Sequence, residues 1–197
     1  GAAAEGRASA GAPPLELAID APEELRALLD RHLDLARLAR EGSGETLTDS
    51  ELRRLVNAAP AEARALLATE GYMDPTVTAE RVDAAGAPAP RPAVRLSVVP
   101  GARTHVAAVE LRIAGALQDA AASGDVQSRA LIDAWHAAWS LPAGAAFSNA
   151  AWRDAKNGAI ARLRSAGYAA ASLQSSAAEI DADSARASLA LEAASGP

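Results

Sequence analysis

Leu67-Ala-Thr-Glu-Gly-Tyr-Met-Asp-Pro-Thr-Val77 and Leu163-Arg-Ser-Ala-Gly-Tyr-Ala-Ala-Ala-Ser-Leu173 show one pattern twice, about 96 residues apart. Each stretch carries the last apolar residues of a helix face, then Gly-Tyr, then residues typical of a strand. Glycine adopts a left-handed conformation at low cost, so we expect positive φ at Gly71 and Gly167, at the ends of these helices. The pattern predicts that a strand–helix–helix–strand–strand unit occurs twice in the chain.

The spacing of apolar residues predicts the other elements of both units. Asp20 can accept hydrogen bonds from the first amides of the first helix, and Thr48 and Glu51 have the spacing of a capping box at the start of the second. Pro60 has no amide proton to donate and should kink or restart that second helix. The predicted helices are residues 22–40, 48–70, 125–139 and 148–166, and the predicted strands are residues 15–19, 73–82, 93–99, 106–113, 170–177 and a run around 189–191.

Composition excludes several classes of protein. The 197 residues carry a net charge of −6, so the chain has no overall basic surface and we expect no nucleic-acid partner. The absence of cysteine excludes disulfides, thiol nucleophiles and cysteine-ligated zinc. The apolar runs are short, and we expect no membrane-spanning helix. Residues 1–14 are small, aperiodic and interrupted by glycine and proline, which is typical of a flexible leader, and we expect domains at 15–101 and 102–197.

The residue types that support catalysis do not form a recognisable site. His32, His105 and His136 fall in different predicted segments, and none has a recurring partner at metal-ligand spacing. Asp133 and His136 can touch on a helix face, where we interpret them as a solvated pair. The acidic run from Glu179 to Asp183 lacks the glycine and distal glutamate of an EF-hand loop and is interpreted as a turn between strands. We therefore expect no enzyme activity, no metal and no cofactor.

Three tryptophans allow two interpretations. Trp135 and Trp139 are four residues apart on one predicted helix face, and Trp152 lies near the start of the next helix. Such a cluster either fills a core that is poor in aromatic residues or lines the pocket of a ligand-binding protein. We favour the core and keep a ligand-binding protein as the alternative from a different class.

The second copy carries an ordered set of residues. In chain order these are Leu141-Pro-Ala-Gly-Ala-Ala-Phe147, Ala151-Trp152, Ala155-Lys156, Gly167-Tyr168, Ser176-Ala177, Ile180-Asp181 and Ser195-Gly196-Pro197. This set resembles the polypeptide-transport-associated (POTRA) domains of TamA-like outer-membrane assembly factors, which are related to BamA. Thr69-Glu-Gly-Tyr72 and Val98-Val-Pro-Gly101 of the first copy support the resemblance, which covers residues 15–197.

The resemblance implies an α+β fold, a tandem of two POTRA-like β-α-α-β-β domains, each a three-stranded mixed sheet with helices on one face. It also implies a periplasmic module that binds proteins. The implied partners are a TamB-like protein anchored in the inner membrane and unfolded outer-membrane or autotransporter clients. TamA-like proteins carry a third such domain and a membrane barrel, neither of which we expect within these 197 residues. A BamA-like or two-partner-secretion POTRA region is the alternative within the superfamily.

The resemblance further implies the strand order first–third–second, which leaves the second strand of each sheet at an edge. Unpaired amides and carbonyls at such an edge can bind an extended segment by strand addition. Thr78→Pro is expected to abolish that binding, provided that the Thr78 amide points outward. The expected protein-binding residues are Thr76, Val77, Thr78, Ala79 and Glu80 in the first copy and Ala171, Ser172, Leu173 and Gln174 in the second.

Overall fold

The computed structural model describes residues 15–41, 47–83 and 91–197 and shows an α+β protein. The chain forms two compact units. The first contains the described residues up to Leu67 together with Pro75–Gly101, and the second contains Ala68–Asp74 and Ala102–Pro197. The expected leader at residues 1–14 lies outside the described residues, as does most of the proline-rich loop that follows Asp83.

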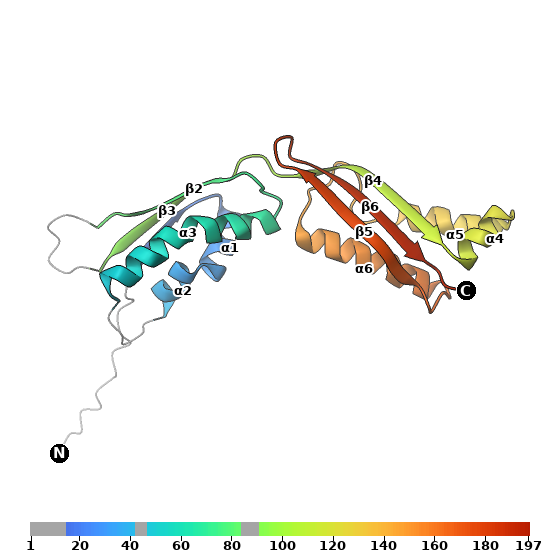
Figure 1. Ribbon diagram of the computed structural model, residues 1–197, viewed down its shortest axis with the longest axis horizontal. Coiled ribbons are helices and arrows are strands. Elements are labelled where there is room, and N and C mark those ends of the chain that lie inside the picture. Colours follow the sequence, from blue (N-terminus) through green and yellow to red (C-terminus); the bar gives the residue numbers. More distant parts are fainter. Residues whose placement is uncertain (1–14, 42–46, 84–90) are drawn as a thin grey trace, which may run out of the picture. The chain divides into compact units, whose positions relative to one another are not determined.

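In the first unit, helices lie against one face of a three-stranded sheet (Figure 1). The strand order is β1-β3-β2, with β1 parallel and β2 antiparallel to the central strand. The strands are β1 (Glu16–Asp20), β2 (Thr76–Arg81) and β3 (Ala93–Val99), and the helices are α1 (Glu23–His32), α2 (Asp34–Arg40) and α3 (Asp49–Thr69).

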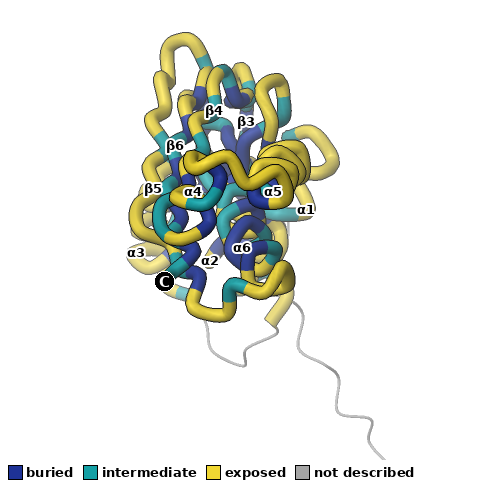
Figure 2. Tube along the Cα trace, turned by 90° about the vertical axis from the view of Figure 1, so that its right-hand side faces the viewer, coloured by how far each residue is buried: buried dark blue, intermediate teal, exposed yellow. Residues whose placement is uncertain are grey.

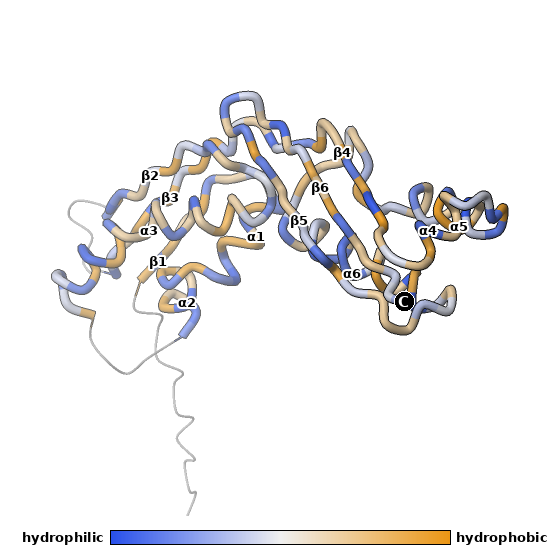
Figure 3. Tube along the Cα trace, turned by 45° about the vertical axis from the view of Figure 1, so that its right-hand side comes forward, coloured by the Kyte–Doolittle hydropathy of each residue, from blue (hydrophilic) through white to orange (hydrophobic). Residues whose placement is uncertain are grey.

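The second unit has the same strand arrangement, β4-β6-β5, with the parallel pair first and the antiparallel pair second. Hydrophobic and hydrophilic residues alternate along β4, as expected for a sheet with one covered face (Figure 3). The strands are β4 (His105–Ala114), β5 (Ser172–Asp181) and β6 (Arg186–Ala194), and the helices are α4 (Ala116–Ala122), α5 (Val126–Ala137) and α6 (Asn149–Ser165). The expected α+β fold class is confirmed, with two units that each have a three-stranded mixed sheet and helices. Each unit has three helices where two were expected, and α4 was not predicted.

The single helix expected at residues 22–40 is broken at Leu33. This residue has an extended backbone, with φ −67° and ψ 141°, and is fully buried. In an unbroken helix Leu35 would lie about 80° or more away from the stripe that contains Leu25, Leu29 and Leu33. The break allows Leu35 to turn into the core, where it is 1% exposed. The amide of Asp34, exposed by the break, donates to the Glu62 carboxylate at 2.9 Å.

The helix starts agree only partly with the sequence predictions. The capping box is confirmed, because the Thr48 amide donates to the Glu51 carboxylate and the Glu51 amide donates to the Thr48 hydroxyl, both at 3.2 Å. The expected Asp20 cap is wrong: Asp20 ends β1, and α1 begins after Pro22 with no side-chain cap. The helix does not restart at Pro60, which lies inside the continuous α3.

The two cores differ in their chemistry. Figure 2 shows buried positions on the helices and strands of the second unit, and its core includes Trp135, Trp139 and Phe147. No Phe, Trp or Tyr lies in the first unit, whose described buried side chains are leucine, valine and alanine together with Pro75. None of the helices in the described part of the chain combines the length and apolarity needed to cross a membrane.

Gly71 has φ +93° and Gly167 has φ +106°, so positive φ is confirmed at both positions. The segment around Gly71 belongs to the second unit. The Thr104 amide donates to the Gly71 carbonyl at 2.8 Å, and Tyr72 forms an antiparallel bridge with Arg103. The Arg103 guanidinium donates to the carbonyl of Glu70 at 3.0 Å and lies 5.7 Å from the Tyr72 ring centre.

Candidate functional site

Both strands expected at a sheet edge, β2 and β5, lie at an edge of their sheets. They belong to different units, so the two sets of expected binding residues form two separate candidate sites. The other edges are formed by β1 and β4. We consider β2 first, because its last residue, Arg81, lines a cavity.

The side chains of β2 alternate between the two faces of its sheet. Val77 is buried and Ala79 is half-buried on the helix-covered face, whereas Thr76, Thr78 and Glu80 are exposed. All five expected residues therefore belong to the edge strand, but Val77 contributes its side chain to the core and has only its backbone free for a partner.

The direction of the β2 amides follows from its pairing with β3. The Val82 amide, just past the strand, donates to Ala93 O at 2.8 Å. Hydrogen-bonded pairs alternate along an antiparallel ladder, and the β2–β3 register is regular, so Thr78 is opposite Ser97 in a hydrogen-bonded pair. The Thr78 amide thus points into the sheet, and the condition set for Thr78→Pro is not met. The amides of Val77, Ala79 and Arg81 point outward.

A cavity of about 280 Å³ lies beside this edge. Its apolar floor comes from α3, where Leu52 is buried and Val56 is half-buried. Its polar rim is formed by Asp49, Arg53 and Arg81. The cavity places an apolar surface next to Arg81, the last residue of β2, whose amide points outward. An extended segment that pairs with this end of the strand could place an apolar side chain there.

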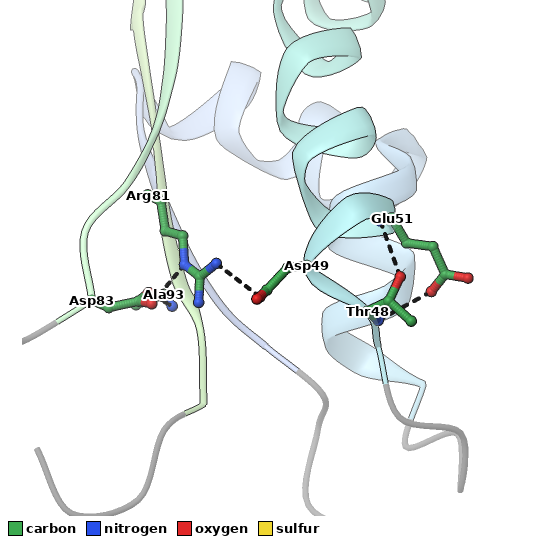
Figure 4. A network of polar contacts seen from close by, with 6 residues as sticks. All are labelled: Thr48, Asp49, Glu51, Arg81, Asp83 and Ala93. Atoms are coloured by element: carbon green, nitrogen blue, oxygen red, sulfur yellow. Dashed lines mark hydrogen bonds and ion pairs between the residues drawn. The ribbon is translucent and has the colours of Figure 1, made fainter.

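Arg81 is held in place at this rim by two carboxylates (Figure 4). Its guanidinium lies 2.6 Å from the Asp83 carboxylate and 3.2 Å from that of Asp49, at the start of α3. Asp83 also accepts the Ala93 amide at 2.6 Å, and this bond, with the Arg81 contact, lowers the pKa of Asp83. The same contact with Asp83, and then that with Asp49, raises the pKa of Arg81.

The β5 edge is longer and more exposed than the β2 edge. Ser172 to Ala178 contain no charged residue, and Leu173 remains 40% exposed. Ala171 is not part of this edge: it precedes the strand, is 1% exposed and donates its amide to Tyr168 O at 2.9 Å. A β-bulge at Gln174 shifts the register between Leu173 and Ser175. Bulges of this kind twist an edge away from further pairing.

The tryptophans fill the core of the second unit, as the favoured interpretation predicted. The Trp135 indole N–H donates to Ala159 O at 2.9 Å, and that of Trp139 donates to Leu141 O at 2.8 Å. The rings of Trp139 and Trp152 contact each other edge to face, with their centres 6.2 Å apart, and the Lys156 ammonium lies 4.8 Å from the Trp152 ring centre. Both buried indole donors are thus used by the fold rather than directed at a ligand.

One of the histidines weighed for catalysis has a backbone partner. The His105 ring pairs with the backbone carbonyl of Arg103 at 3.0 Å. The described residues hold no group of three or more histidine, cysteine, aspartate or glutamate side chains that could bind a metal. The acidic run is a turn only in part, because β5 continues to Asp181 and the turn begins after it. Hydrogen bonds from Ser184 and then Asp183 lower the pKa of Asp181.

The sequence analysis did not identify the cavity or Arg81. Leu52 and Val56 are four residues apart on α3, a spacing that is typical of a buried helix face rather than of a cavity. Only the packing of α3 against the sheet shows that Val56 stays half-buried beside the edge of β2. The pairing of Arg81 with Asp49 joins residues far apart in the sequence and has no local signature.

The sequence matches no family model, and no curated protein matches it. Solved structures with a similar chain trace include POTRA domains. The third to fifth POTRA domains of Haemophilus influenzae BamA match with 17% identity and a TM-score of 0.42, covering 93% of this chain and 66% of that one. The first two POTRA domains of Omp85 from Anabaena match with 18% identity and a TM-score of 0.40, covering 93% of this chain and 94% of that one.

Proposed function

We propose that this chain is a non-enzymatic, periplasmic protein-binding module, a POTRA tandem of an outer-membrane assembly factor with domains at residues 15–101 and 102–197. It binds extended segments of other proteins by adding them as a strand to the β2 edge. The observation that carries this proposal is the row of outward-facing amides at Val77, Ala79 and Arg81. Arg81 also lines the cavity whose apolar floor is formed by Leu52 and Val56.

The chemistry of this edge suits unfolded membrane-protein strands. Backbone hydrogen bonds to the β2 edge are independent of the partner's sequence, so many clients can use them. The cavity beside α3 offers space for an apolar side chain of an extended segment, and outer-membrane strands alternate apolar and polar residues. Unfolded outer-membrane or autotransporter segments are the clients that this edge fits.

Within the superfamily we propose a TamA-like factor, with a TamB-like inner-membrane-anchored protein as partner. The support is the ordered residue set of the second copy, from Leu141 to Pro197. A BamA-like POTRA region is the second candidate, supported by the same strand order in both sheets.

The strand-addition proposal is tested with Ala79→Pro, which removes an outward amide without removing a bond to β3. The probe is a ten-residue peptide of alternating valine and threonine, titrated into the full chain and followed by NMR. Loss of one backbone hydrogen bond and the steric effect of the proline ring should weaken binding about tenfold or more. Thr78→Ala is the matched control and should change affinity by less than about twofold, because that side chain lies on the exposed face.

Shifts confined to β5 or to the tryptophans, with residues 76–81 unaffected, would contradict the assignment of the β2 edge. The choice of factor needs a separate experiment. Because the chain has no cysteine, Thr78→Cys can carry a photoreactive crosslinker at one defined position. A crosslink to a TamB-like protein in cells supports the TamA-like factor, whereas capture of outer-membrane clients alone favours the BamA-like one.

A further inference from the structure

The strands β1 and β4 form the second edge of each sheet, and they are placed in the same way. The first residue of β1 donates its amide to Pro92 O at 2.9 Å, and the first residue of β4 donates to Ala185 O at 3.0 Å. In both sheets the accepting residue comes directly before the residue of the central strand that pairs first, which is Ala93 in β3 and Arg186 in β6. Successive residues of a strand alternate in direction, so Leu17 in β1 and Val106 in β4 both present their amide and carbonyl to the outside of the sheet.

In the second unit this outer position is already occupied by an extended segment. The Val106 amide donates to Ala145 O at 2.8 Å, and the Gly144 amide donates to Val106 O at 2.7 Å. An antiparallel bridge between His105 and Ala146 continues the pairing. The loop before α6 therefore acts as a short added strand, and it shows which kind of chain fits this edge.

In the first unit the corresponding position is open. Within residues 15–41, 47–83 and 91–197, no backbone group pairs with the outer side of Leu17 or Ile19. A cavity of about 280 Å³ lies beside them, between β1 and α1. It is lined by Leu17, Ile19, Glu23, Arg26, Ala27 and Asp30.

The charge around this cavity selects the partner. Asp30 is matched by Arg40, whose guanidinium lies 3.8 Å from its carboxylate. Asp20 and Glu23, at the end of β1 and the start of α1, form no ion pair with a described residue. Among the residues that line the cavity, Arg26 is the only cation. The groove therefore carries a surplus of negative charge, which favours a basic side chain.

We propose that the groove of β1 and α1 binds an extended segment of another protein, antiparallel to β1. Its apolar side chains enter beside Leu17 and Ile19, and a lysine or arginine lies near Asp20 and Glu23. This site is distinct from the β2 edge, so the first unit can hold one extended segment on each side of its sheet.

The direct test is amide hydrogen exchange on the full chain, measured by NMR. The probe is a ten-residue peptide of alternating valine and threonine with two of its threonines replaced by lysine. At nine-tenths occupancy the Leu17 and Ile19 amides should exchange about tenfold more slowly. Slowing only at Val77, Ala79 and Arg81, or at no amide, would overturn the proposal. Slowing at Leu17 and Ile19 without slowing on β2 would support this site and contradict the β2 proposal.

A second test fills the groove. Ala27 is an exposed residue of α1 that lines the cavity, so Ala27→Trp blocks the groove without entering the core. The substitution should weaken binding of the lysine peptide to this edge about tenfold, as read from the chemical shifts of Leu17 and Ile19. Ala61→Trp, at an exposed position of α3 away from both cavities, is the matched control and should leave binding unchanged. Unchanged affinity in Ala27→Trp would overturn the proposal.

The charge argument has its own readout. Asp20→Asn combined with Glu23→Gln should weaken the lysine peptide several-fold and leave the valine–threonine peptide unaffected. Glu24→Gln, on an exposed residue that does not line the cavity, is the control. Equal weakening of both peptides would contradict the proposed basic side chain.

Discussion

Two glycines with the same backbone conformation have different surroundings. At Gly167 an added Cβ would meet no atom within 4 Å, so only its φ of +106° opposes a larger residue. At Gly71 the same Cβ would lie 2.3 Å from the carbonyl oxygen of Phe147, which is backbone and cannot rotate away. This close approach allows two backbone hydrogen bonds: the Thr104 amide donates to the Gly71 carbonyl, and the Phe147 amide donates to the Thr104 carbonyl at 2.9 Å. Gly71 is thus required by contact as well as by conformation.

We predict that Gly167→Ala costs about 1–2 kcal/mol, the cost of a left-handed non-glycine residue. Gly71→Ala should cost clearly more, because the backbone at Phe147 has to shift as well. Urea unfolding followed by tryptophan fluorescence measures both, since all three tryptophans lie in the second unit. An equal loss of unfolding free energy in the two variants would contradict the steric argument. So would a Gly71→Ala variant whose fluorescence transition falls at the same urea concentration as that of the original chain.

Residue patterns predicted what depends on near neighbours in sequence. The reciprocal bonds of Thr48 and Glu51, and the positive φ of both glycines, follow from spacing and from the conformational freedom of glycine. The contact of Gly71 with Phe147 joins residues far apart in the chain, and no local pattern contains it. The same limit applies to the pair Arg81–Asp49 in the candidate site.

At the scale of elements, the resemblance predicted the strand order of both sheets. It did not predict the helix break at Leu33 or the β-bulge at Gln174. Leu29 and Leu35 are both buried in the core. An unbroken helix with 3.6 residues per turn would place them on different faces, so the helix breaks at Leu33 between them. The bulge at Gln174 depends on the register with β6. Both edge strands could therefore be expected before the structure was known. Only the structure shows that the β2 edge is regular and that the β5 edge has a bulge.

The bulge has a consequence for self-association. Leu173 pairs with Ala193 and Ser175 with Glu192, so deleting Gln174 would leave a regular, uncharged edge from Ser172 to Ala178. We predict that this deletion makes the chain self-associate, because a long flat edge pairs readily with another. Sedimentation velocity over a range of protein concentrations would measure it.

A matched control for the deletion is Gln174→Ala, which keeps the residue count and with it the register. It should remain in the same association state as the original chain. Self-association of Gln174→Ala to the same degree, or a deletion variant that stays unassociated at every concentration, would show that the bulge does not protect β5.

At the scale of the whole molecule, the two units bury different kinds of side chain. Every aromatic residue of the chain lies in the second unit, including Tyr72 of the Ala68–Asp74 segment. A buried aromatic side chain removes about 150–250 Å² from water, more than leucine or valine. The first unit depends on aliphatic side chains alone, with an open groove at each edge of its sheet. The unit that carries both proposed binding grooves is thus the one whose core has no Phe, Trp or Tyr.

We predict that the first unit unfolds at a lower urea concentration than the second. Far-UV circular dichroism, which follows the helices of both units, should show an earlier transition that tryptophan fluorescence does not detect. Leu29→Ala, at a fully buried position of the first unit, should move only that early transition and cost about 2–5 kcal/mol. Unfolding curves that coincide for the two probes, and that Leu29→Ala shifts together, would mean that the chain unfolds as one cooperative body. Aromatic burial would then not give the two units different stabilities.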